Sequence, residues 1–215
     1  MIPLINDWEI QTMINEFPNH FRQPSIVPSL PCQQCFATIM LCAFYGCHRM
    51  GELIIKSDKK LLDSRKLIKR SSLTFTNRHA QYRLPYHKAD PFYRGSDVIF
   101  SQHDVADPVL LLKSYTSMRD TRHGPRLPLF LCEDGSLPNR SWFDRKFFSF
   151  LSHDFRGHSA RAGGATYFAS LGLSDSIIQA LSRWSSTAWK IYIRDNPTIC
   201  AEQQLASLGL LHPHH

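Results

Sequence analysis

The chain has 215 residues, a length that fits one large domain or two small ones. Its hydrophobic share of 43%, with 12% aromatic residues, is enough to build a buried core and excludes a wholly disordered chain. The formal net charge is +7, and the excess lies between Lys56 and Arg94, where eleven basic residues stand against three acidic ones. Positive charge concentrated in one segment favours a polyanionic partner such as nucleic acid.

The first residues of the chain do not have the pattern of a secretory signal. No basic segment precedes an apolar one, and Asp7 and Glu9 come early. The longest apolar stretch runs from Ile39 to Cys47 and is far shorter than the roughly 18 residues that a membrane-spanning helix needs. We therefore expect an intracellular protein, and a nuclear one if its cell is eukaryotic.

The six cysteines do not form the pattern of a disulfide scaffold in a chain of this length. Cys32 and Cys35 have the spacing of half a zinc site, but no second Cys-x-x-Cys or spaced histidine pair completes it. We interpret them as buried cysteines of a helix. The histidines at 212, 214 and 215 are interpreted as part of a disordered tail.

Hydrophobic spacing predicts helices first and a small sheet after them. An amphipathic pattern over 1–20 predicts one helix that ends at Pro18, and a proline-rich linker follows it. The dense apolar run from Cys32 to Tyr45 predicts a buried helix. Three short runs typical of strands then predict an antiparallel meander: Leu73–Thr76, Gln81–Leu84 and Val98–Phe100.

The sequence beyond the third strand predicts helices only. Their expected starts are Asp107, Ser141, His158, Ser174 and either Ser186 or Thr187, and the third of them ends at Gly172. The fifth carries Tyr192, and a short last helix covers 201–207. The predicted fold class is therefore mainly α with a small three-stranded antiparallel sheet (α+β).

Several residues suited to phosphate chemistry follow these elements. Arg49 comes directly after the buried helix, with Glu52 three residues on, and Lys88 comes just after the second strand. His158 and Arg161 are also three residues apart, so a helix places them on one face.

Trp184 and Tyr192 follow these residues in the chain. Arg, Lys, His-x-x-Arg, Trp and Tyr in this order resemble the signature of the tyrosine recombinases, the phage-integrase family. The resemblance covers residues 32–206 and is closest from His158 to Asn196. There the chain is similar to Cre-like recombinases and to those encoded by fungal mobile elements.

The resemblance implies the tyrosine recombinase catalytic-domain fold and an enzyme that breaks and rejoins DNA. The reaction is site-specific recombination or integration, here of a mobile element, and it needs neither a metal nor a nucleotide cofactor. Double-stranded DNA is the implied partner, and a homo-oligomer, a tetramer on paired sites, is the implied assembly.

The resemblance also assigns roles to residues. Arg49 and Arg161 grip the scissile phosphate, since a planar guanidinium donates two parallel hydrogen bonds and stays charged. Tyr192 attacks phosphorus to form a 3′-phosphotyrosyl link. Lys88 protonates the departing 5′-oxygen, and His158 accepts and positions a proton.

Two further residues complete the implied site. Trp184 closes the pocket, and Glu52 orients Arg49 as a supporting partner. The basic segment supplies the expected contacts to DNA phosphates, although a merely solvated charged loop stays an alternative. Those expected contacts are Lys56, Lys59, Lys60, Lys66, Lys69, Arg70, Arg83 and Arg94.

The chain departs from the family pattern in three respects. Ser182 stands where the family usually has glycine, and the interval from Trp184 to Tyr192 is one residue shorter than usual, so Arg183 is an alternative occupant of the His/Trp position. Only one predicted helix precedes the core, where the family has a DNA-clamping domain.

These departures shape the expected domain organisation. We expect residues 1–31 to be a remnant of the clamping domain, 32–206 the catalytic domain and 207–215 the tail. The alternative function is a catalytically inactive, DNA-binding remnant of a truncated recombinase.

Overall fold

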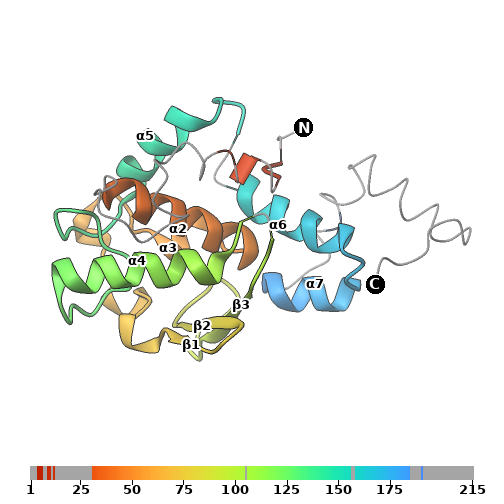
Figure 1. Ribbon diagram of the computed structural model, residues 1–215, viewed down its shortest axis with the longest axis horizontal. Helices are drawn as coiled ribbons and strands as arrows, with labels where there is room; N and C mark the ends of the chain where they lie inside the picture. The colour runs from red at the N-terminus through yellow and green to blue at the C-terminus, as the bar shows by residue number, and fades with distance from the viewer. Residues whose placement is uncertain are drawn as a thin grey trace, which may run out of the picture.

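The computed structural model describes residues 4–6, 9–10, 12, 31–104, 106–155, 158–184 and 190. In this part of the chain, helices pack around one another and one small antiparallel sheet covers a side of them (Figure 1). The predicted fold class, mainly α with a small sheet, is confirmed.

Helix α2 (Pro31–Tyr45) forms the centre of the molecule. Every residue from Gln34 to Tyr45 is buried, which is the pattern of a helix surrounded by other elements. It packs against α4 (Pro108–His123) and against α6 (Ser159–Ser170) (Figure 1). The dense apolar run therefore predicted both the helix and its burial correctly, and Cys35 lies inside it as a buried residue.

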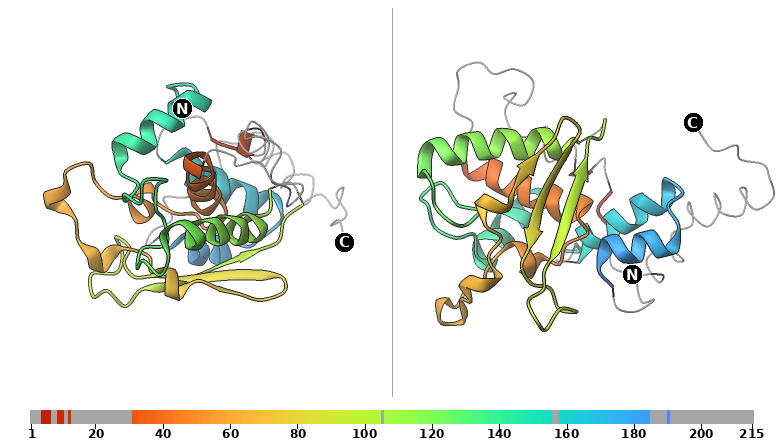
Figure 2. Two further views of the ribbon diagram at one scale, coloured as in Figure 1. Left: turned by 60° about the vertical axis from the view of Figure 1, so that its left-hand side comes forward. Right: turned by 90° about the horizontal axis from the view of Figure 1, so that it is seen from below.

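The sheet is a meander of β1 (Thr74–Phe75), β2 (His79–Leu84) and β3 (Ser96–Ser101), as the sequence predicted. All its neighbouring strands are antiparallel, and the β2–β3 register pairs His79 with Ser101. Alternate residues of β2 are buried and exposed, and both β2 and β3 contact α4 (Figure 2). One face of the sheet thus belongs to the core.

Short elements connect these layers. Helix α3 (Met50–Leu53) follows α2 after a tight turn. The basic segment then forms three 3₁₀ turns, Lys59–Leu61, Ser64–Lys66 and Arg70–Ser72. Helix α7 (Asp175–Ser182) follows α6 and packs against it.

The predicted helix starts are correct at α4 and wrong by one residue at α5. Asp107 caps α4, since its carboxylate accepts the N–H groups of the first turn. Helix α5 (Arg140–Phe150) is capped by Asn139, whose side-chain oxygen accepts the N–H of Trp142. The hydroxyl of Ser141, the predicted start, instead lies 2.7 Å from that of Ser57.

The ends of the chain are described only in part. Within the predicted first helix, Glu9, Ile10 and Thr12 are helical and Ile10 is buried in the core. The predicted fifth helix with Tyr192 and the helix over 201–207 lie outside the described residues, except that Lys190 is helical.

Metal-binding clusters and membrane-spanning helices are both absent from the described residues. They contain no cluster of three or more histidine, cysteine or acidic side chains that could hold a metal ion. None of the helices they form is both long and apolar enough to cross a membrane.

Two glycines of α6 let neighbouring backbone segments approach this helix closely. A Cβ atom on Gly164 would overlap the carbonyl oxygen of Phe44, and one on Gly163 would overlap that of Ile5. Both obstacles are backbone atoms, which cannot rotate away as a side chain can. Gly164 therefore sets the distance between the helix that precedes Arg49 and the helix that carries Arg161, and Gly163 sets the distance between α6 and Ile5.

Replacing Gly164 by alanine should lower the free energy of unfolding by on the order of 3 kcal/mol, because the added methyl group has no space. Urea unfolding followed by circular dichroism measures this. Gly51→Ala is the matched control, since a Cβ at Gly51 meets no atom within 4 Å. Equal stability of the two variants would contradict the close packing of α2 on α6.

Candidate functional site

Four residues that the sequence predicted for the site line one small pocket: Arg49, His158, Arg161 and Trp184, around a cavity of about 140 Å³. Arg49 caps α3, His158 and Arg161 belong to the start of α6, and Trp184 follows the end of α7. The fold thus brings together side chains from three distant parts of the chain.

Arg161 is the most unusual side chain in this pocket. It is only 2% exposed, and its guanidinium lies over the ring of Trp184, 4.3 Å from the ring centre. One nitrogen, Nη2, donates to the carbonyl oxygen of Ser182. Its Nε and Nη1 are buried and have no hydrogen-bond partner among the described residues. Because unpaired buried donors on a cation are costly, Arg161 is suited to receive an anion in the pocket.

Burial lowers the pKa of Arg161 to about 10, with a further contribution from the charge of Arg49. The group still carries its charge at neutral pH. Arg49 itself is a quarter exposed, and its Nη1 lies 3.4 Å from Oε1 of Glu52. Glu52 also accepts the backbone N–H of Arg49 at 3.2 Å, so one carboxylate holds both the main chain and the side chain of this arginine.

The other oxygen of Glu52 joins a buried network. Its Oε2 lies 2.9 Å from Nδ1 of His48, and Nε2 of His48 lies 2.7 Å from the hydroxyl of Tyr82 on β2. Arg183 lies 3.4 Å from the same carboxylate oxygen and donates to the carbonyl of Gly46 at 2.9 Å. The network therefore connects α3, the sheet and the end of α7.

Sequence reasoning missed His48 as part of this site. The available signal was a histidine directly before Arg49, at the end of an otherwise apolar run. Burial and the charge of Arg183 lower the pKa of His48 to about 4, so the ring is neutral at physiological pH. A neutral ring can donate from Nδ1 to Glu52 and accept from Tyr82 at Nε2, which satisfies both nitrogens.

Burial would raise the pKa of Glu52, but the hydrogen bond with His48 and the charges of Arg183 and Arg161 lower it to about 2. Glu52 is thus a carboxylate. Among the described residues of this cluster, the guanidinium groups of Arg49, Arg161 and Arg183 therefore face a single carboxylate. The remaining positive charge favours a phosphate group, and it favours a transition state with added negative charge even more.

Arg183 and Trp184, the two alternatives for the His/Trp position, have different surroundings in the structure. Arg183 has a left-handed backbone conformation (φ 55°) at the end of α7, and its side chain contacts Gly46 and Glu52. Trp184 lines the pocket with Arg161. Ser182, which stands where the family usually has glycine, is buried and donates its hydroxyl to the carbonyl of Ile178.

His158 is exposed at the start of α6, and burial of part of its ring together with the charges of Arg161 and Arg49 lowers its pKa. It is therefore neutral at physiological pH and able to accept a proton. Tyr192, the predicted nucleophile, lies outside the described residues.

Lys88 is exposed in the loop between β2 and β3. Its neighbours His87 and Ala89 line an open hollow of about 460 Å³ together with Arg183 and Trp184. Trp184 thus borders both this hollow and the arginine pocket.

Some basic side chains of the 56–94 segment form ion pairs within the protein, and others are exposed. Arg70 is paired with Asp120 at 2.7 Å, and Arg83 is paired with Asp97 at 3.1 Å, so part of the charge is compensated within the protein. The side chain of Lys59 lies outside the described part of the chain. The remaining predicted DNA contacts are exposed: Lys56, Lys60, Lys66, Lys69 and Arg94.

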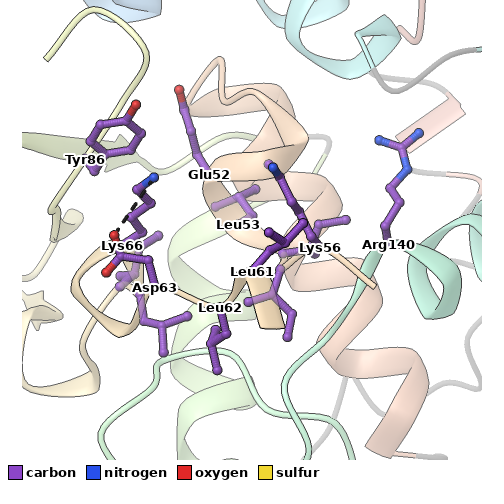
Figure 3. Close-up of a pocket in the computed structure, with 14 residues that line it drawn as sticks. Glu52, Leu53, Lys56, Leu61, Leu62, Asp63, Lys66, Tyr86 and Arg140 are labelled. Atoms are coloured by element: carbon purple, nitrogen blue, oxygen red, sulfur yellow. Dashed lines mark ion pairs between the residues drawn. The ribbon is translucent and has the colours of Figure 1, made fainter. Parts of the chain in front are cut away.

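A third pocket, of about 390 Å³, lies between α3 and the 3₁₀ turns of the basic segment (Figure 3). Leucines 61 and 62 line its apolar side, and Lys56, Lys66 and Arg140 are among its polar lining residues. Glu52 also lines this pocket, so it adjoins the arginine cluster.

Comparison with known proteins identifies the fold. No protein-family model and no curated protein matches the chain. Among solved structures, XerA recombinase has a TM-score of 0.61 at 16% identity, covering 96% of this chain and 66% of its own. XerH recombinase in a post-cleavage complex with palindromic difH substrate has a TM-score of 0.60 at 14% identity, covering 96% and 54%.

FLP recombinase in a Holliday-junction complex has a TM-score of 0.51 at 15% identity, covering 84% of this chain and 43% of its own. The chain spans about half the length of the XerH structure. At these identities the comparison shows the fold, and the expectation from the sequence is confirmed at that level: the chain has the fold of tyrosine recombinase catalytic domains.

The unfolding free energy should fall as the pH drops from 6.5 to about 4, because unfolded His48 takes up a proton in this range and the folded protein excludes it. In His48→Gln this group is absent, so stability should depend less steeply on pH over the same range. Urea unfolding of both proteins at a series of pH values measures the slopes. Identical slopes would contradict the buried, neutral state of His48.

Inorganic phosphate or sulfate should raise the melting temperature by a few degrees, because an anion satisfies the unpaired donors of Arg161. Arg161→Met keeps much of the side-chain volume but removes the charge, and the rise should be lost. The control is Arg122→Met, an exposed arginine paired with Glu133. A rise that persists in Arg161→Met would show that the anion binds elsewhere.

Proposed function

We propose that this protein cleaves and rejoins DNA at a specific site through a 3′-phosphotyrosyl intermediate, as a recombinase or integrase of a mobile element. The observation that carries the proposal is the pocket next to Arg49 in which Arg161 has buried donors that no described residue pairs with. The fold supports it, because the chain shares it with XerA, XerH and FLP recombinases.

The phosphate chemistry follows from the cluster. A scissile phosphate between Arg49 and Arg161 would accept hydrogen bonds from the two Arg161 donors that have no partner among the described residues. The pentacoordinate transition state has more negative charge on its equatorial oxygens than the diester has. Fixed guanidinium groups therefore stabilise it more than the ground state, which lowers the barrier.

In the proposed reaction, the hydroxyl oxygen of Tyr192 forms a bond to phosphorus while the bond from phosphorus to the 5′-oxygen breaks. The phenolic proton goes to His158, whose lowered pKa leaves it neutral and able to accept. The 5′-oxygen takes a proton from Lys88. The assignment of Tyr192 rests on its position in the sequence after Trp184.

Rejoining is the reverse reaction, with a 5′-hydroxyl attacking the phosphotyrosine. The covalent link preserves the energy of the phosphodiester bond, so the proposed cycle consumes no nucleotide. Double-stranded DNA is the proposed partner. XerH was solved with its difH substrate and FLP with a Holliday junction, which supports DNA strand exchange and the proposed tetramer on paired sites.

A suicide substrate tests the proposal. A pool of DNA duplexes with a randomised sequence and a nick close to the cleavage position lets the short 5′-hydroxyl product diffuse away, which traps the covalent adduct. We expect an adduct with the unaltered chain and none with Tyr192→Phe, because phenylalanine has no nucleophilic oxygen. Denaturing gel electrophoresis detects the adduct.

Tyr167→Phe is the matched control, since it removes a hydroxyl that contacts His103 away from the pocket, and its adduct should persist. An adduct that forms equally well with Tyr192→Phe would overturn the assignment of the nucleophile. DNA binding that weakens steeply with salt, without any adduct, would favour the alternative of a catalytically inactive DNA-binding remnant.

A further inference from the structure

The loop between β2 and β3, which carries Lys88, is built around the carboxylate of Asp90. Asp90 is 7% exposed and accepts the backbone N–H of Gly95 at 2.6 Å, and its own N–H donates to the carbonyl of His87 at 2.8 Å. Hydrogen bonds from the N–H groups of Gly95 and then Arg94 lower the pKa of Asp90, although burial opposes this. The side chain of Asp90 thus holds the returning end of the loop at Gly95, and its backbone N–H closes the turn that contains Lys88.

The backbone of this loop is folded tightly. Tyr93 and Gly95 have left-handed conformations, with φ of 55° and 70°. A Cβ on Gly95 would lie 2.7 Å from the carbonyl oxygen of Leu84, so the end of the loop returns to within contact of its start. Tyrosine is unfavourable at positive φ, so other interactions must hold Tyr93 in this conformation.

Those interactions come from the basic segment. The rings of Tyr86 and Tyr93 lie 4.9 Å apart, one from each side of the loop. Lys66 lies over Tyr86 at 4.4 Å and Arg65 over Tyr93 at 4.8 Å. The hydroxyl of Tyr93 donates to Asp63 at 3.0 Å.

Figure 3 shows Lys66 between Tyr86 and Asp63, with its amino group directed toward the tyrosine ring. Asp63, Arg65 and Lys66, which we call the 63–66 turn, thus fasten the loop by cation–π contacts and one hydrogen bond. The cationic groups of Arg65 and Lys66 thus each lie over an aromatic ring of the loop.

The loop also faces the arginine cluster. His87 and Ala89, on either side of Lys88, line the same hollow as Arg183 and Trp184. Trp184 in turn lies against the guanidinium of Arg161. A loop held in this position keeps Lys88 at the border of the site, whereas a loose loop would leave a long, exposed lysine free to sample many positions.

We propose that Asp90 is a positioning residue that, together with the Tyr86–Tyr93 pair and the 63–66 turn, holds Lys88 at the departing 5′-oxygen. This inference rests on the proposed function. It assigns Arg65 to the support of the loop, and it gives Lys66 this supporting role in addition to the predicted contact with DNA.

The chemistry of the leaving group separates this role from general structural support. When the bond from phosphorus to the 5′-oxygen breaks, its electron pair goes to an alkoxide that needs a proton, which Lys88 supplies. If sulfur replaces that oxygen, the electron pair goes to a thiolate, which is stable without a proton. A variant whose only defect is a misplaced Lys88 is therefore slow on ordinary DNA and restored on the sulfur-substituted strand.

The experiment measures the rate of adduct formation on two suicide substrates that differ only in this bridging atom. Asp90→Asn should slow cleavage of ordinary DNA by on the order of 100-fold, as expected for a displaced catalytic group, and reach nearly the unaltered rate on the sulfur substrate. Lys88→Ala sets the reference for complete loss of the proton donor. It should show the same pattern with a larger defect on ordinary DNA.

Asp134→Asn is the matched control. Asp134 also accepts a backbone N–H in a tight turn, from Ser136 at 2.9 Å, but its loop carries no residue of the proposed site. It should leave the rates on both substrates unchanged. If Asp90→Asn fails to fold, Tyr93→Ala takes its place, because it removes the aromatic partner of Tyr86 from the surface of the loop.

Two results would overturn the inference: an equal loss of rate on both substrates, or no loss on either. Both differ from failure of the proposed function, in which the unaltered chain forms no adduct with either substrate.

Discussion

The arrangement of the site depends on the contacts that the Glu52 carboxylate makes. One of its oxygens contacts Arg49, and the other contacts His48 and Arg183. Through these contacts it joins the end of α2, the start of α3 and the end of α7. Tyr82 extends the network to the sheet through His48. The distant segments that supply the pocket thus meet at one buried negative charge.

This arrangement leaves the cluster short of negative charge. Glu52 is shared among several cationic neighbours, while two donor nitrogens of Arg161 have no partner in the part of the chain that the structure describes. A protein selected only for stability would pair or remove such a group, since an unpaired buried charge destabilises the folded state. The deficit is understandable if an external phosphate completes the site, because electrostatic preorganisation requires charges that are in place before the reaction. The proposed function thereby explains a feature that stability alone does not.

The fold could be predicted from the sequence to a large extent because its strongest signals are local. The apolar run of α2 and the alternating residues of β2 each have the period of their element, and Asp107 caps α4 by a short-range hydrogen bond. The start of α5 was missed because Asn139 and Ser141 are both suitable caps. A contact with Ser57, far away in the sequence, occupies the second of them.

The residues of the candidate site could be predicted where they follow the order of the family signature. They were harder to predict where contacts between distant parts of the chain determine which residues take part. The order of Arg49, His158, Arg161 and Trp184 was enough to place them in one group, and the structure brings these four to one pocket. The roles of His48 and Asp90 could not be read from the sequence. His48 forms a hydrogen bond with a tyrosine on the sheet, and Asp90 accepts one from a backbone group of its loop. Both contacts exist only once the chain has folded.

The most direct test of the account is to locate the covalent link by mass spectrometry. An adduct trapped on nicked DNA, digested with nuclease and protease, leaves a nucleotide attached to a single peptide. We predict that this peptide contains Tyr192 and that the nucleotide is linked through its 3′-phosphate. A nucleotide on any other residue, or a link through a 5′-phosphate, would contradict it.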